Sequence, residues 1–105
     1  MPQFAVHRNR HQATKARFPL LLNVQSDLLE PLATRVVVPL APAGSMARSA
    51  MDTLTPTLRV EGKDYLMMTP QLAGISTREL GPAVDDLSSQ RGSILAAMDM
   101  LFTGI

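Results

Sequence analysis

The stretch Phe18-Pro19-Leu20-Leu21-Leu22-Asn23-Val24 decides the fold, because it is a nearly continuous apolar run of strand length. Such a run, followed by polar residues, indicates a strand buried in the core. Pro19 has no N–H to donate and therefore favours the start of a strand or an edge. Before this run, Gln3–His7 alternates apolar with polar residues, and after it Thr34–Leu40 contains three consecutive valines closed by Pro39. The first forty residues therefore predict three strands.

A hairpin is predicted further along the chain. Thr57–Val60 and Tyr65–Thr69 flank the polar segment Glu61-Gly62-Lys63-Asp64. Gly62 can supply the positive φ of a two-residue hairpin turn, and Asp64 is interpreted as a turn residue. Several short strands separated by turn signals predict a small barrel or sandwich, with mainly β structure.

The connecting segments carry their own expectations. Leu28-Leu29-Glu30-Pro31 is expected to expose two leucines, and Leu72–Ile75 indicates another short strand. The segment rich in Ala, Met and Ser favours a short helix near Ser45–Met51. Gly81-Pro82 is expected to break the chain.

The final segment is the clearest helix, which makes the fold class α+β. Ser88 is expected to cap its N-terminus, and two aspartates just before it favour the positive end of the helix dipole. Gly104 is expected to end the helix. One apolar face repeats at helical spacing through Ile94, Ala97, Met98, Leu101 and Phe102. The apolar end of the chain either packs against the barrel or a second copy of the chain, or contacts a partner.

The composition is that of one folded domain, residues 1–105. The 105 residues are 46% hydrophobic and 18% charged, which is too apolar for intrinsic disorder. No apolar run approaches the roughly 20 residues of a membrane span, and basic residues stand where a signal peptide needs its apolar core. The absence of cysteine excludes disulfides, zinc–thiolate sites and cysteine nucleophiles. We therefore expect a cytoplasmic protein with no membrane contact.

The net charge of +1 conceals an uneven distribution. Residues 1–26 contain four basic residues and no acid, whereas residues 27–105 contain six basic and nine acidic residues. Either the basic segment is a solvated loop between two strands, or it binds an acidic protein or nucleic acid. It lacks the interleaved aromatic residues that stack on the bases of single strands.

Catalytic and metal-binding patterns are weak. The chain has no G-x-S-x-G motif, P-loop or glycine-rich dinucleotide loop. Its two histidines, His7 and His11, have no carboxylate close in sequence, so no metal or cofactor is expected. The remaining catalytic candidate is a phosphate or RNA-cleavage site made from Arg17, Arg35 and Arg59.

Several motifs together resemble the CcdB toxin family. They are Val24-Gln25-Ser26-Asp27, Val38-Pro39-Leu40-Ala41, Met67-Met68-Thr69, Asp86-Leu87-Ser88 and Leu101-Phe102-Thr103-Gly104-Ile105. The resemblance runs in the same order and with similar spacing from Gln3 to Ile105. No single motif is decisive, but their order and the C-terminal ending make the joint match specific.

The resemblance implies an SH3-like antiparallel β-barrel with a small β-wing and a C-terminal helix. It implies a homodimer with Met100 at the contact between the two protomers. It also implies a toxin that is not an enzyme and needs no cofactor or direct contact with nucleic acid. Such a toxin binds the A subunit of DNA gyrase, traps the cleaved gyrase–DNA complex, and is neutralised by a CcdA-like antitoxin in plasmid or chromosomal maintenance.

The resemblance also implies site residues. The gyrase-facing set is Ser26, Leu28, Leu29, Asp99, Phe102, Thr103, Gly104 and Ile105. We expect an acidic, disordered antitoxin to use the basic residues Arg8, Arg10 and Lys15.

The chain departs from the family pattern at two of these positions. Thr103 stands where the family usually has a tryptophan that stacks on gyrase, and Asp99 stands where asparagine is common. Two alternatives stay open. One, motivated by the basic segment, is an RNA-cleaving toxin of the MazF and Kid type on the same fold. The other is a weakened CcdB homologue that binds antitoxin without poisoning gyrase.

Overall fold

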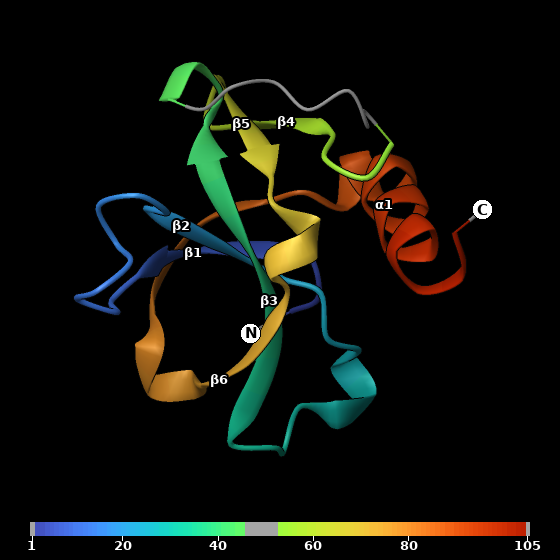
Figure 1. Cartoon of the computed structure of the whole chain (residues 1–105). Helices are drawn as coiled ribbons and strands as arrows, with labels where there is room; N and C mark the ends of the chain where they lie inside the picture. Colours follow the sequence, from blue (N-terminus) through green and yellow to red (C-terminus); the bar gives the residue numbers. More distant parts are fainter. Residues whose placement is uncertain (1, 46–52, 105) are drawn as a thin grey trace.

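A curled antiparallel sheet forms most of the molecule, and a single α-helix packs at its end (Figure 1). The computed structural model describes residues 2–45 and 53–104, and these residues contain the sheet and the one α-helix. The sheet order is β4-β5-β3-β2-β1-β7, and β6 pairs with β3. The elements are β1 (Ala5–Asn9), β2 (Leu20–Asn23), β3 (Thr34–Pro42), β4 (Thr57–Val60), β5 (Lys63–Met67), β6 (Ala73–Ser76), β7 (Leu80–Asp86) and α1 (Arg91–Thr103). This half-barrel confirms the predicted mainly β fold, with β4–β5 as the wing.

Strand β2 is buried on both faces, which explains its continuous apolar sequence. Leu20 and Leu22 join the main core, while Leu21 points to a second, smaller cluster with Val37 and Leu80. A strand covered on both sides has no need for alternating polar residues. The prediction of a core strand here is confirmed.

Pro39 ends the run of valines but lies inside β3, which contains the predicted strand Thr34–Leu40 and continues to Pro42. The strand accommodates Pro39 because β3 changes partners around it. On one side β3 pairs with β6 over Thr34–Val37 and with β5 over Leu40–Pro42. The carbonyl of Pro39 accepts a hydrogen bond from Met68 N on that side. The backbone N and the carbonyl of a strand residue point to the same side of the strand. The backbone N of Pro39, which carries no hydrogen, therefore points into the gap between β6 and β5.

The wing is a two-residue hairpin, as predicted, with Glu61 and Gly62 both at positive φ (49° and 79°). Asp64 is not a turn residue, which corrects the prediction. It lies in β5 opposite Arg59 and forms an ion pair with it at 3.4 Å. Gln90 covers the outer edge of β4: its Oε1 accepts from Arg59 N (2.9 Å) and its Nε2 donates to Arg59 O (2.8 Å).

The expectation that Gly81-Pro82 breaks the chain is wrong, because both residues lie inside β7. The register between β1 and β7 shifts on either side of His7. At this irregularity, a Cβ on Gly81 would lie 2.9 Å from the carbonyl oxygen of Arg8. Glycine is therefore needed for close approach of two strands rather than for a turn.

Helix α1 completes the core with Ile94 and Ala97, both fully buried. Ser88 does not cap it, contrary to the prediction. Instead Asp86 Oδ1 accepts a hydrogen bond from Ser88 N (2.8 Å), and the hydrogen bonds from Ser88 hold the pKa of Asp86 below its usual value. Gly104 ends the helix as predicted, at φ 74°.

Of the short helix expected near Ser45–Met51, residues 46–51 lie outside the described residues, and Ser45 ends a 3-10 helix over Ala43–Ser45. Within residues 2–45 and 53–104, no helix is long and apolar enough to cross a membrane.

Candidate functional site

The connection between β2 and β3 places three leucines in solvent. Leu28 is 90% exposed, Leu29 47% and Leu32 50%. We call residues 26–34 the leucine loop. Because large apolar side chains are rarely left this exposed together without a purpose, the loop is a candidate binding surface. The predicted exposure of Leu28 and Leu29 is confirmed.

Local hydrogen bonds shape the start of the leucine loop. Ser26 Oγ accepts from Leu28 N (3.2 Å) and begins a short 3-10 helix over Asp27–Leu29. Asp27 Oδ1 accepts from Gln3 N (2.7 Å), which fastens this turn to the residues before β1. The Ser26 hydroxyl therefore has a structural use, and Leu28 projects from the turn.

The end of α1 is a second apolar surface. Phe102 is 67% exposed, so it does not pack against its own chain, whereas Leu101 and Met100 are partly buried. Thr103 and Asp99 are exposed, and Thr103 Oγ1 donates to the main-chain oxygen of Asp99 (2.7 Å). Ile105, the last residue of the predicted gyrase-facing set, lies outside the described residues.

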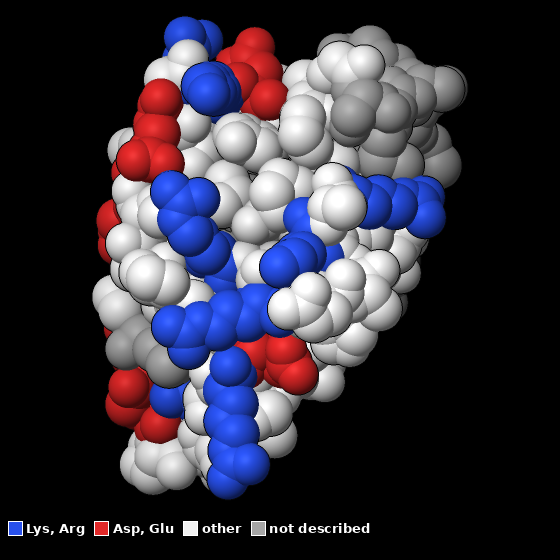
Figure 2. Space-filling model, turned by 90° about the vertical axis from the view of Figure 1, so that its left-hand side faces the viewer, with Lys and Arg blue, Asp and Glu red and all other residues white. Residues whose placement is uncertain are grey.

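The basic residues of the N-terminal segment lie on a different side of the molecule. In Figure 1 the β1–β2 loop extends to the left, while the leucine loop and the end of α1 lie on the right. Figure 2 shows a band of Lys and Arg on the left-hand face, with acidic side chains mostly at its margins. The exposed residues Arg8, Arg10, Lys15 and Arg17 belong to β1 and this loop, and we call them the basic strip.

Asn9 holds the β1–β2 loop in place from its buried position. Its Nδ2 donates to Thr14 Oγ1 (3.0 Å) and to the carbonyl of Phe18 (2.8 Å), and its Oδ1 accepts from His11 N (2.9 Å). The Arg17 guanidinium lies over the Phe18 ring, with 5.1 Å from Cζ to the ring centroid. The loop is therefore ordered by its own side chains, and the charges of the basic strip stand at its surface.

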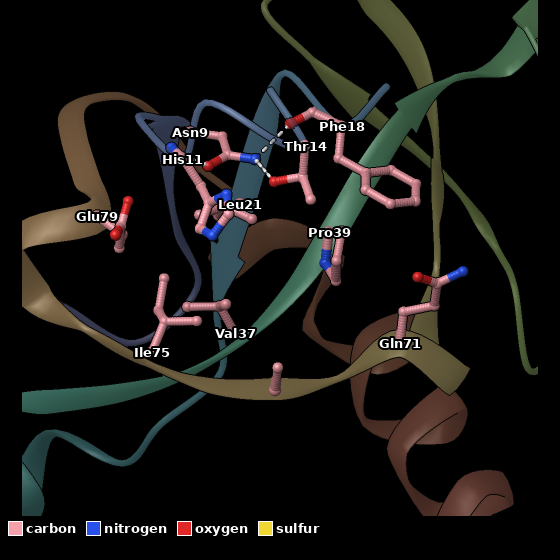
Figure 3. A pocket seen from close by; sticks show the side chains of 11 residues that line it. Asn9, His11, Thr14, Phe18, Leu21, Val37, Pro39, Gln71, Ile75 and Glu79 are labelled. Atoms are coloured by element: carbon pink, nitrogen blue, oxygen red, sulfur yellow. Dashed lines mark hydrogen bonds between the residues drawn. The ribbon is translucent and has the colours of Figure 1, made fainter. Parts of the chain in front are cut away.

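Sequence reasoning missed a pocket of about 200 Å³ beneath this loop (Figure 3). Its wall is mostly apolar, and its polar lining residues include His11 and Glu79. The apolar members come from distant parts of the chain and are Phe18, Leu21, Val37, Pro39, Ala73 and Ile75. Because strand pairing alone brings them together, no local motif could have revealed the pocket. A second hollow of about 340 Å³ brings Arg8 near Lys63 and Tyr65 of the wing.

The three arginines of the RNA-cleavage alternative do not converge. Arg35 is 4% exposed and is occupied by main-chain carbonyls, while Arg17 lies in the β1–β2 loop and Arg59 in the wing. Among the residues that the structure describes, no group of three His, Asp or Glu side chains is placed to hold a metal ion. His7 is buried, with Nδ1 3.0 Å from the Gly81 carbonyl.

Comparison with solved structures supplies the fold class. The fold is similar to that of the Mycobacterium tuberculosis toxin MazF-mt6, with a TM-score of 0.66, 19% sequence identity, and coverage of 93% of this chain and 95% of that one. At this identity the likeness shows a shared fold: a curled antiparallel sheet closed by a terminal helix.

The family follows from the sequence. The CcdB protein family matches residues 3–104, and the chain belongs to that family. The protein is therefore a toxin of a toxin–antitoxin system. The roles of the individual site residues stay predictions.

Proposed function

We propose that this toxin binds the A subunit of DNA gyrase and holds the enzyme on cleaved DNA. The exposure of Leu28 is the observation that carries the proposal most directly. A leucine this exposed offers almost its full burial free energy, roughly 1.5–3 kcal/mol, to a partner. Phe102 offers a second apolar anchor, and aromatic residues dominate the energetics of many interfaces.

The proposed working unit is a homodimer in the cytoplasm, with Met100 at the contact between the two protomers. Met100 is partly buried on α1, and it projects to a different side of the helix from the exposed Phe102. A two-fold dimer would present two copies of the apolar surface to the two-fold gyrase A dimer. In this proposal the toxin acts only by binding, needs no cofactor or direct nucleic-acid contact, and serves plasmid or chromosomal maintenance.

The proposed antitoxin is CcdA-like, with an acidic, disordered segment that binds the basic strip. The four positive side chains of the strip are exposed, so they attract an acidic chain. Because the strip lies apart from the leucine loop, the antitoxin surface and the gyrase surface would be chemically distinct.

An RNA-cleaving toxin is the second candidate, favoured by the fold shared with MazF-mt6 and by the basic strip. It is the weaker candidate because the buried Arg35 cannot reach a phosphate without leaving its carbonyl partners. Incubation with long single-stranded RNA separates the two candidates. Discrete fragments would favour cleavage, and intact RNA would favour the binding function.

A third candidate binds antitoxin without poisoning gyrase, because Thr103 offers much less contact area than tryptophan. It predicts tight antitoxin binding without growth arrest when the toxin is expressed alone. Growth arrest by this chain would exclude it.

Calorimetric titration of the gyrase A dimerisation region with the toxin tests the main proposal. We expect saturable binding, which is weakened when Phe102 is replaced by serine. A CcdB protein with the family's tryptophan serves as the positive control. No heat of binding at tens of micromolar toxin, with a working control, would contradict the proposal.

A further inference from the structure

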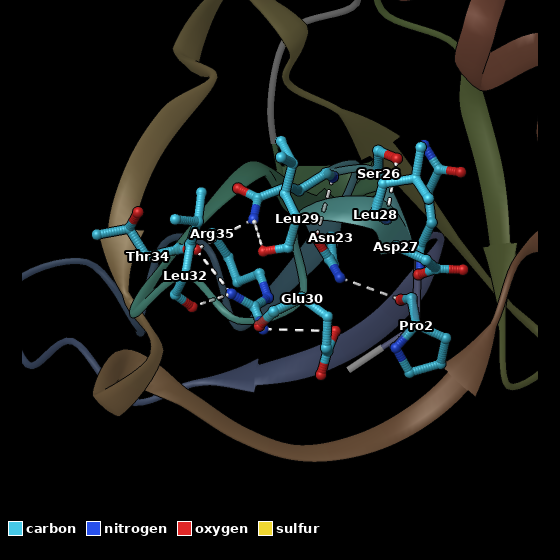
Figure 4. A network of polar contacts seen from close by, with 12 residues as sticks. Pro2, Asn23, Ser26, Asp27, Leu28, Leu29, Glu30, Leu32, Thr34 and Arg35 are labelled. Atoms are coloured by element: carbon cyan, nitrogen blue, oxygen red, sulfur yellow. Dashed lines mark hydrogen bonds and ion pairs between the residues drawn. The ribbon is translucent and has the colours of Figure 1, made fainter.

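Two buried polar side chains, one on each flanking segment, hold the leucine loop. Figure 4 shows one of them, Arg35, beside Glu30, Leu32 and Thr34 of the loop. Gln25 follows β2, and Arg35 lies in β3. We propose that Arg35, assisted by Gln25, is a positioning residue that holds the leucine loop of the free toxin in the conformation that binds gyrase. This inference rests on the proposed function, since it concerns the same surface.

Arg35 donates hydrogen bonds to three main-chain carbonyls of the loop. Its Nη1 donates to the carbonyls of Leu32 (2.5 Å) and Thr34 (2.8 Å), and its Nη2 donates to the carbonyl of Glu30 (2.7 Å). The Glu30 carboxylate lies 3.4 Å from the same Nη2 and balances the buried charge. One guanidinium thus fixes the second half of the loop.

Gln25 fixes the middle of the loop in the same way. Its Nε2 donates to the carbonyls of Leu29 (3.3 Å) and Thr34 (3.2 Å), while its Oε1 accepts from Val36 N in β3 (3.0 Å). Together the two side chains bond to four of the loop's carbonyls, which turn inward. Carbonyls of an ordinary surface loop bond to water, and such a loop is free to move.

Arginine suits this task because its planar guanidinium has five donors in a fixed fork. Lysine keeps the charge, but its single ammonium cannot occupy the places of both Nη1 and Nη2. Preorganisation of a binding loop raises affinity because the entropy of ordering the loop is lost on folding rather than on binding. Arg35 therefore acts on affinity through Leu28 and Leu29, without itself touching the partner.

The test uses Arg35→Lys in the full chain, with Arg78→Lys, an exposed arginine in the turn before β7, as the matched control. Amide hydrogen exchange is measured at Leu29 and Leu32, whose N–H groups bond within the loop, and at Leu22 in the core. We expect Arg35→Lys to speed exchange at least tenfold in the loop and less than twofold in the core.

In the same preparations, we expect Arg35→Lys to weaken binding to the gyrase A dimerisation region at least tenfold and Arg78→Lys to leave it unchanged. If Arg35→Lys does not fold, Gln25→Met is measured instead, with the same expectations at Leu29. Faster exchange throughout the core would show a merely structural role and overturn the inference.

Leu28→Ser, measured beside these variants, separates this inference from the proposed function. If Leu28→Ser loses gyrase binding while Arg35→Lys and Gln25→Met retain it, the positioning role is wrong and the proposed function stands. If Leu28→Ser binds as well as the unchanged chain, the leucine loop is not the gyrase surface, and the inference falls with it.

Discussion

Replacement of Leu28 by alanine should weaken gyrase binding roughly thirtyfold while leaving the fold unaffected. The substitution removes three side-chain carbons, and the side chain is 90% exposed in the free toxin. At about 0.8 kcal/mol for each buried carbon, burial by gyrase of the exposed nine-tenths of the side chain makes the loss about 2 kcal/mol. A factor of ten in affinity corresponds to about 1.4 kcal/mol, which gives the thirtyfold estimate.

The assay pairs two measurements on the same protein. Calorimetry with the gyrase A dimerisation region gives the affinity, and thermal unfolding gives the stability, which should change by less than about 0.5 kcal/mol because the residue is at the surface. Leu95→Ala, on α1 and outside the predicted set, is the control for affinity, which should not change. Its stability should fall by about 1 kcal/mol, because the Leu95 side chain is only 40% exposed. Unchanged affinity in Leu28→Ala, or an equal loss in the control, would refute the reasoning.

Four further predictions concern other parts of the molecule. Thr103→Trp should tighten gyrase binding by about 2 kcal/mol and hasten growth arrest, because it supplies a large ring; equal affinity would mean that this position does not face gyrase. Gly81→Ala should destabilise the fold by about 1–3 kcal/mol in thermal unfolding, because its Cβ meets the neighbouring strand. Gly74→Ala, whose Cβ meets nothing within 4 Å, should have a much smaller effect, and equal losses would argue against the clash. Asp86→Asn should lower stability at neutral pH, since the lowered pKa of the folded carboxyl stabilises the protein above the unfolded value of about 3.9. The difference should vanish as the pH falls through the lowered pKa, and a constant difference down to that pH would contradict this. Replacement of the basic strip by glutamines should weaken binding of an acidic antitoxin segment and flatten its salt dependence; an unchanged salt dependence would exclude the strip as that surface.

The elements that sequence predicted well depend on local patterns. The apolar run of β2, the turn at Gly62 and the apolar face of α1 each carry their signal within a few residues. The expectation at Gly81 was wrong, and the place of Pro39 inside β3 could not be explained from the sequence, because proline and glycine usually interrupt strands. Here a change of strand partner and a close strand approach accommodate them. Both depend on contacts distant in sequence.

Some features of the candidate site could likewise be predicted from the sequence, and others could not. The exposure of Leu28 could be predicted because two leucines stood in a connection between strands. The role of Arg35 could not, since a charged residue in a strand is usually at the surface, and only the folded loop turns its carbonyls toward the guanidinium. For the apolar end of the chain, the sequence left open whether it packs against the barrel or stays exposed. In the structure, Phe102 on α1 is exposed.

The central claim is that this toxin acts on gyrase by binding rather than by its own catalysis. A gyrase cleavage assay tests it directly: purified gyrase, supercoiled plasmid and ATP are incubated with toxin and then treated with detergent and protease. We expect linear plasmid to accumulate as toxin is added, and the amount of linear plasmid to fall strongly with Leu28→Ala. Plasmid that stays uncut at tens of micromolar toxin, while a CcdB protein with the family's tryptophan produces linear DNA, would contradict the account.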